Sequence, residues 1–211
     1  TTYRTTEEVI RRANDTRWQP GWRTGHYESF FVRANDPRRP QAFWIRYTIF
    51  SPEGRPEDAR GELWAVVFDG KRGIHTAAKT EVPIAQCEFR NDRLGAYVAD
   101  ARLEPGRVVG AAASGGHTIA WDLSFTGDAE PLLALPPALY DAKLPRAKTL
   151  VPLPLATFRG TLTVDGKAYP VFDWVGSQNH NWGSRHTDHY AWGQVAGFDD
   201  APESFLEVAT A

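Results

Sequence analysis

The chain has 211 residues and a formal net charge of −2, a balance that argues against nucleic acid and against a charged membrane surface as the main partner. Its single cysteine, Cys87, rules out an internal disulfide framework, and no apolar run approaches the roughly 20 residues that a membrane-spanning helix needs. We therefore expect a cytoplasmic protein without a membrane span, and no motif in the chain implies a cofactor.

The first 25 residues form a predicted N-terminal segment with one short helix. Thr5 and Glu8 have the spacing of a capping box, in which each side chain bonds the backbone N–H of the other residue. Pro20 and Gly21 then end any helix.

From residue 26 onward, short strands alternate with turns at roughly 8–12-residue spacing, which is typical of a β-sandwich or a β-barrel. The predicted strands cover residues 26–34, 42–50, 62–69, 73–82, 87–90, 96–103, 107–113, 117–125, 157–164, 167–175, 189–198 and 204–210. Asp165 and Gly166 mark a hairpin turn between two of them. Residues 42–50 alternate cleanly, which places Phe43, Ile45, Tyr47 and Ile49 on one face and Trp44, Arg46 and Thr48 on the other. The sequence therefore predicts an all-β protein.

Two features of the composition leave alternatives open. Eight tryptophans are many for this length, and they suit an aromatic core as well as a cavity that holds a ligand. Residues 127–156 are rich in proline and leucine, and a loop this long is unusual in a compact domain. We interpret it as an apolar crossover, which serves either as a lid or as a strap over an exposed sheet face.

The stretch from Gln178 to Trp192 is the densest polar and aromatic motif in the chain. It packs amides, imidazoles, a guanidinium and indoles into a predicted turn between two strands. Such groups cost free energy when they are buried without partners, so we expect a hydrogen-bond network in which Trp182 is largely buried. His180, His186 and His189 have a spacing that zinc accepts, but the amides fit a hydrogen-bonded turn better, and we predict no metal.

This motif, with its Gln-x-His-Asn-Trp-Gly stretch, Arg-His pair and Tyr-x-Trp strand, resembles the carotenoid 1,2-hydratase and AttH-like family of lipocalin-like proteins. Tocopherol cyclase and the lipocalin-like Diels-Alderases are remoter relatives. The stretches 26–31, 44–46 and 121–123 support the resemblance, which spans roughly residues 20–210. It implies an antiparallel, lipocalin-like (calycin-type) barrel with little helix over residues 26–211.

Members of that family usually carry two barrels in tandem. The resemblance therefore implies that this chain is the first half of a two-barrel protein, with a second barrel or a homodimer partner beside it. A site between two barrels would then be incomplete in this chain.

The expected function is the binding of a hydrophobic, terpenoid- or polyketide-like small molecule. The alternatives are a hydratase or cyclase acting on a polyene or isoprenoid, and a structural barrel filled with side chains. An enzyme of that kind needs a carboxylic acid kept neutral by an apolar site, and the candidate acids are Glu28, Asp173 and Asp188. The candidate ligand-binding residues are Trp44, Arg46, Trp64, Trp121, Gln178, His180, Asn181, Trp182, Arg185, His186, Tyr190 and Trp192.

Overall fold

The computed structural model describes residues 5–185 and 189–210, and they form an antiparallel barrel with little helix. Its helical elements are α1 (Thr6–Arg11) and the 3-10 turns η1 (Pro56–Asp58), η2 (Ile84–Gln86) and η3 (Pro137–Tyr140). The capping box of α1 is present as predicted, with Thr5 and Glu8 bonded to each other's backbone N–H. Among the described residues, no helix has the length and apolar character needed to cross a membrane.

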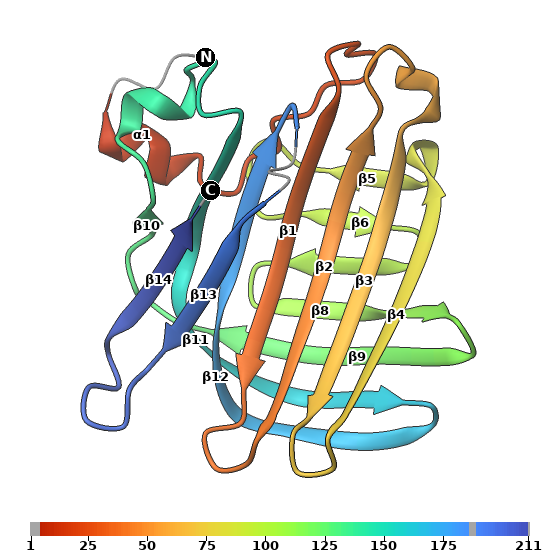
Figure 1. The fold of residues 1–211 in the computed structure, drawn as a ribbon, viewed down its shortest axis with the longest axis vertical. Helices are drawn as coiled ribbons and strands as arrows, with labels where there is room; N and C mark the ends of the chain where they lie inside the picture. Colours follow the sequence, from red (N-terminus) through yellow and green to blue (C-terminus); the bar gives the residue numbers. More distant parts are fainter. Residues whose placement is uncertain (1–4, 186–188, 211) are drawn as a thin grey trace.

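Twelve strands make one sheet in the order β4-β3-β2-β1-β12-β11-β9-β8-β7-β6-β5, with β10 paired to β11. The strands are β1 (His26–Asn35), β2 (Gln41–Ser51), β3 (Arg60–Asp69), β4 (Ile74–Pro83), β5 (Cys87–Phe89), β6 (Ala96–Val98), β7 (Ala101–Glu104), β8 (Arg107–Ser114), β9 (His117–Thr126), β10 (Leu132–Leu133), β11 (Ala147–Val164) and β12 (Lys167–Gly183). In Figure 1, β1 to β4 form the near wall, β5 to β9 cross behind it, and the long curved strands β11 and β12 join the two. This confirms the predicted all-β, lipocalin-like architecture.

The barrel closes where β4 approaches β8. Side chains bridge these two edges, because the Lys79 N–H donates to Ser114 Oγ at 2.9 Å and the Ala113 N–H donates to Thr80 Oγ1 at 3.0 Å. The barrel is therefore nearly closed, and side chains satisfy edge groups that a complete ladder would otherwise pair.

The interior of the barrel is a packed apolar core. The alternation predicted for β2 is confirmed, since Phe43, Ile45, Tyr47 and Ile49 are buried inside. Phe43, Ile45 and Tyr47 join inward-facing residues of the other strands, including the fully buried Trp174, in one continuous cluster. The residues between them on β2 point outward, so any ligand contact they make lies outside the barrel.

Three local predictions are wrong. The predicted strand 96–103 is split into β6 and β7 at Ala99, which has a φ of 50°. The last third of the crossover 127–156 is already strand, because β11 begins at Ala147. The polar motif is not a turn: β12 continues to Gly183 and pairs with β1 and β11, whose backbones satisfy its amides.

The end of the chain forms a second, separate sheet of two strands, β13 (Ala191–Ala196) and β14 (Phe205–Thr210). This hairpin lies beside the barrel rather than in its wall (Figure 1). It covers the outer face of β1 and β12, which explains why β1 is buried on both faces along almost its whole length.

Candidate functional site

A cavity of about 1060 Å³ lies outside the barrel, between the outer face of β1 and β2 and the β13–β14 hairpin. We call it the outer groove. Its remaining walls come from the turn between β1 and β2 and from the crossover that precedes β11. The main lining residues are Tyr27, Phe31, Arg33, Trp44, Arg46, Leu135, Lys148, Asn181, Tyr190, Trp192 and Gln194.

On the floor of the outer groove, two aromatic rings and two guanidinium groups alternate along and across strands β1 and β2. In the β1–β2 ladder Phe31 lies opposite Arg46, and Arg33 lies opposite Trp44. The Phe31 and Trp44 rings are 6.0 Å apart between centroids. The Arg46 guanidinium lies 5.7 Å from the Trp44 ring centroid. A ligand on this floor would therefore meet apolar faces and positive charge side by side.

Gln194 fixes the β13–β14 hairpin to the outer face of the barrel. Its Oε1 accepts hydrogen bonds from Arg33 Nε and Ser177 Oγ, both at 2.8 Å, and its Nε2 donates to Asn179 Oδ1 at 2.7 Å. Next to this network, the Trp192 ring meets Phe31 edge-on at 6.1 Å. The hairpin thus adds an aromatic wall whose position depends on a buried hydrogen-bond network.

Three cations of the outer groove have no carboxylate within 4.0 Å among the described residues. Arg33 and Arg46 lie on the floor, and Lys148 donates only to the backbone carbonyls of Ala142 and Pro145. Burial lowers the pKa of Arg33 to about 10, although the nearby Glu207 opposes this. Burial also lowers the pKa of Arg46 and of Lys148. All three therefore lose hydration without gaining an ion-pair partner in the part of the chain that the structure describes.

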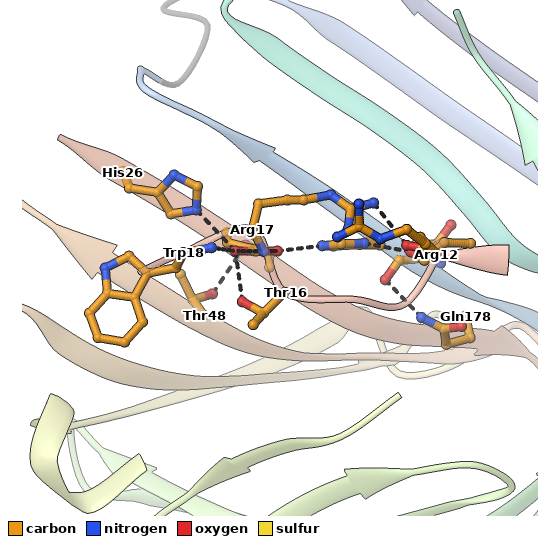
Figure 2. Close-up of polar contacts among 12 residues, drawn as sticks. Arg12, Thr16, Arg17, Trp18, His26, Thr48 and Gln178 are labelled. Atoms are coloured by element: carbon orange, nitrogen blue, oxygen red, sulfur yellow. Dashed lines mark hydrogen bonds and ion pairs between the residues drawn. The ribbon is translucent and has the colours of Figure 1, made fainter. Parts of the chain in front are cut away.

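A second polar centre, around Glu28, lies on the inner face at one end of the barrel. Glu28 is fully buried and accepts hydrogen bonds from Thr16 Oγ1 and from the backbone N–H groups of Arg17 and Trp18. His26 Nε2 lies 3.0 Å from its Oε2. Figure 2 shows the contacts of Thr16, Arg17, Trp18 and His26 converging on one carboxylate. The chain from residue 16 to residue 18 is thereby fixed at the barrel end.

Burial by itself would raise the pKa of Glu28, but hydrogen bonds from His180 and His26 outweigh it and hold the pKa well below its usual value. Glu28 is therefore an ionised carboxylate with saturated acceptors. A polyene cyclase needs a neutral acid instead. This geometry favours a role for Glu28 in anchoring the N-terminal segment.

His180 connects the Glu28 centre to the N-terminal segment. Its Nε2 lies 2.8 Å from Glu28 Oε1, and its Nδ1 lies 2.7 Å from the Ala13 carbonyl oxygen. A neutral imidazole has one N–H and can donate to only one of these two oxygen atoms. Hydrogen bonds to both oxygens therefore require one more proton, carried either by the imidazole or by the Glu28 carboxyl. Burial lowers the pKa of His180, and Glu28 opposes this effect.

Trp182 is 6% exposed, which confirms the burial predicted for it. It packs with Val9, Ala13, Tyr140 and Leu150 in a small cluster separate from the main core. This cluster joins the N-terminal segment, the crossover and the start of β11. The crossover therefore packs against one end of the barrel.

Of the predicted ligand-binding residues, five line the outer groove: Trp44, Arg46, Asn181, Tyr190 and Trp192. Others lie elsewhere. Gln178, His180 and Trp182 are buried near the barrel end, and Trp121 is buried in the main core. Trp64 lies on the outer face of β3, where its ring centroid is 4.5 Å from Lys79 Nζ, and Arg185 lines a smaller cavity of about 400 Å³.

Of the other two candidate acids, only Asp173 lies among the described residues. Asp173 forms an ion pair with Arg159 Nε at 2.6 Å on the barrel surface. Asp188 and His186 lie outside the described residues.

The sequence analysis did not single out Arg33, Phe31, Lys148 or Glu207. An arginine directly after the apolar run Phe30, Phe31 and Val32 was a usable signal for Arg33. Glu207 lies on β14 beside Gln194, and burial raises its pKa against the hydrogen bond from Gln194. No local pattern marks Glu207, because its burial depends on the docking of the hairpin.

Solved structures with this architecture are known. An AttH-like protein of Nitrosomonas europaea (NE1406) has a TM-score of 0.63 at 16% identity, over 87% of this chain and 60% of that one. The chain has the fold of AttH-like proteins. Kievitone hydratase of Nectria haematococca has a TM-score of 0.50 at 12% identity, over 83% of this chain and 53% of that one. The predicted resemblance is therefore confirmed at the level of the fold.

Among curated proteins, the chain is similar to two uncharacterised proteins of Mycobacterium tuberculosis. These are MT0513 of strain CDC 1551 / Oshkosh and Rv0493c of strain ATCC 25618 / H37Rv, each 27% identical over 196 residues. The match covers 91% of this chain but 55% of each relative, so the chain spans about half the length of the curated relatives it matches. No protein-family profile matches the sequence.

Proposed function

We propose that this chain binds a hydrophobic small molecule in the outer groove. The observation that carries the proposal is a cavity of about 1060 Å³ walled by aromatic side chains from two separate sheets. Phe31 and Trp44 come from the barrel, whereas Tyr190 and Trp192 belong to the segment that covers it. Small-molecule sites are typically concave and apolar with a few placed polar groups, and a volume of this order fits a drug-sized ligand.

The location differs from that of a ligand held inside a barrel. The barrel interior is occupied by its own side chains, among them Phe30, Phe158 and Trp174. The outer groove instead uses residues that point away from that core. A ligand there would lie between the barrel and the hairpin, so its affinity would depend on both.

The proposal is tested with Nile red, a neutral apolar dye whose fluorescence rises in an apolar site. We expect saturable binding to the wild-type chain. Replacing Trp44 by Ala should weaken binding by about tenfold or more, since a buried aromatic contact is worth over about 1 kcal/mol. Trp64→Ala is the matched control, because Trp64 is on the neighbouring strand, also faces outward and lies outside the outer groove.

Two results would contradict this proposal. One is the absence of saturable binding of Nile red by the folded wild-type chain. The other is an equal loss of affinity in Trp44→Ala and Trp64→Ala, which would place the dye elsewhere on the surface.

The second candidate function is a hydratase- or cyclase-type reaction on a polyene or isoprenoid. One observation favours it: Glu207 lies beside the aromatic wall at Trp192, and burial raises the pKa of this carboxyl. A carboxyl whose pKa is raised is a better proton donor to a double bond at neutral pH than an ordinary carboxyl, and an indole face stabilises the cation formed. Turnover of a polyene that disappears in Glu207→Gln, with Nile red binding unchanged, would support the enzyme over the binding protein.

A further inference from the structure

The outer groove contains more positive charge than an apolar ligand requires. Its charged lining residues are Arg33, Asp36, Arg39, Arg46 and Lys148. Asp36 is already paired, because Arg39 Nε donates to its carboxylate at 2.7 Å. Among the described residues, Arg33, Arg46 and Lys148 have no carboxylate within 4.0 Å, although Glu207, Glu62 and Asp141 act on them from farther away. Burying a charge without a close partner costs free energy.

Arg46 is the cation best placed to meet a ligand. Its Nε donates to Ser29 Oγ at 2.8 Å, and Ser29 Oγ lies 3.3 Å from Thr48 Oγ1. This contact holds the guanidinium by one edge only. Among the described residues, no hydrogen bond to its two Nη atoms is found, and neither atom is sealed from solvent. The remaining donors of the guanidinium are thus open to an acceptor.

The surroundings of Arg46 suit an anion that arrives from outside. Among the described residues, the acidic group that acts most strongly on it is Glu62, and the phenols of Tyr27 and Tyr190 also act on it. Glu62 is held by other donors, since Lys79 Nζ lies 3.1 Å from its Oε1 and Trp64 Nε1 donates to its Oε2 at 3.0 Å. Arg46 therefore feels a negative potential from Glu62 without forming an ion pair with it.

Arg33, which lies opposite Trp44 on the same floor, is also a buried arginine with part of its guanidinium left without a hydrogen bond in the described residues. It is 8% exposed, and two of its nitrogens are bonded to the neutral amides of Gln194 and Asn35. Its Nη2 is buried without a hydrogen-bond partner in the described residues. Arginine offers a planar fork of donors that matches a carboxylate, so two such groups beside aromatic rings define a mixed apolar and anionic preference.

We propose that the ligand of the outer groove is an apolar carboxylic acid, whose carboxylate binds the free Nη edge of Arg46 while its apolar body lies on Phe31, Trp44 and Trp192. This assignment rests on the proposed binding function and specifies the chemical class of the ligand. Lys148 and Arg33 add positive potential along the groove and favour the ionised acid over its neutral derivatives.

The test compares pairs of probes that differ only in charge. Capric, myristic and oleic acids, each with its methyl ester, are titrated into the folded chain at neutral pH by calorimetry. We expect at least one acid to bind roughly 10- to 100-fold more tightly than its ester, which is the range of one charge-assisted hydrogen-bonded pair. In Arg46→Gln the acid should bind no better than the ester, and ester affinity should be unchanged.

The controls separate this inference from the proposed function. Arg46→Lys keeps the charge and should keep part of the preference for the acid. Arg159→Gln removes an exposed arginine that is paired with Asp173 outside the outer groove, and it should behave as wild type. Each variant is first checked for a wild-type circular dichroism spectrum and for Nile red binding.

Equal affinity for acids and esters in the wild type would overturn the acidic ligand class while leaving apolar binding in place. A preference for the acid that survives in Arg46→Gln would overturn the role given to Arg46. A loss of ester and acid binding together in that variant would also overturn it, because Arg46 would then shape the groove rather than recognise charge. If no acid, ester or Nile red binds to the wild type, the proposed function itself fails.

Discussion

Replacing Trp182 by Ala tests how the N-terminal segment is held against the barrel. The indole is 6% exposed, and its ring centroid lies 4.7 Å from the ring of His180 and 5.8 Å from that of Tyr140. The Arg17 guanidinium lies 4.8 Å from the same ring. One side chain therefore contacts β12, the crossover and the N-terminal segment.

The magnitude follows from the buried area. A buried tryptophan removes about 200 Å² from water, which at roughly 25 cal/mol per Å² corresponds to about 5 kcal/mol. Measured costs of comparable replacements by Ala fall at about 3–5 kcal/mol, because the surroundings relax in part. We therefore expect Trp182→Ala to lower the free energy of unfolding by about 3–5 kcal/mol.

Urea denaturation followed by far-ultraviolet circular dichroism measures this change without relying on tryptophan fluorescence. Trp192→Ala is the comparison variant: its indole is 41% exposed, so the same arithmetic gives about 3 kcal/mol, and it should cost less than Trp182→Ala. A Trp182→Ala midpoint equal to that of the wild type, with the same slope, would refute the packing argument.

Further predictions concern the same region. Gly176→Ala should destabilise the fold by about 1–3 kcal/mol, since a Cβ there would lie 1.8 Å from the Arg33 carbonyl oxygen. Gly193→Ala, where the nearest neighbour would be at 3.4 Å, should change stability by less than about 1 kcal/mol in the same denaturation assay, and equal costs would contradict the steric reason. His180→Ala should cost about 1–3 kcal/mol through unpaired partners, and it fails as a prediction if its urea midpoint matches the wild type. Because the folded-state pKa of Glu28 is depressed, its contribution to stability is present above its usual value of 4.5 and is lost as pH falls below that value. Between pH 7 and pH 4 the free energy of unfolding should therefore fall more in the wild type than in Glu28→Gln. An equal fall in the two proteins would contradict this role of the Glu28 carboxylate.

Local sequence was enough to predict most of the secondary structure. The alternation from Phe43 to Ile49 and the Asp165–Gly166 turn depend only on neighbouring residues, and the structure confirms both. The capping box of α1 is equally local. The burial of Trp182 could also be predicted, because an indole among so many polar groups gains free energy only if it packs.

The pairing between strands that are distant in the chain could not be predicted from local sequence patterns. Glu28 and His180 are 152 positions apart, and they meet because β1 pairs with β12. The polar motif looked like a turn in isolation, since amides and glycines favour turns. In the folded chain Gly176 and Gly183 instead allow neighbouring backbones to approach closely within a strand.

The outer groove is the clearest product of tertiary structure. The sequence by itself indicated that β2 has an aromatic and basic face, with Trp44 and Arg46, but it could not show what covers that face. The β13–β14 hairpin docks there through Gln194, and only this docking turns an exposed sheet face into a cavity and buries Arg33 and Glu207. The physical reason is the distance along the chain over which each property is determined. Alternation depends on neighbouring residues and shows which of them share a face, whereas the burial and charge of that face depend on distant elements that the whole fold brings together.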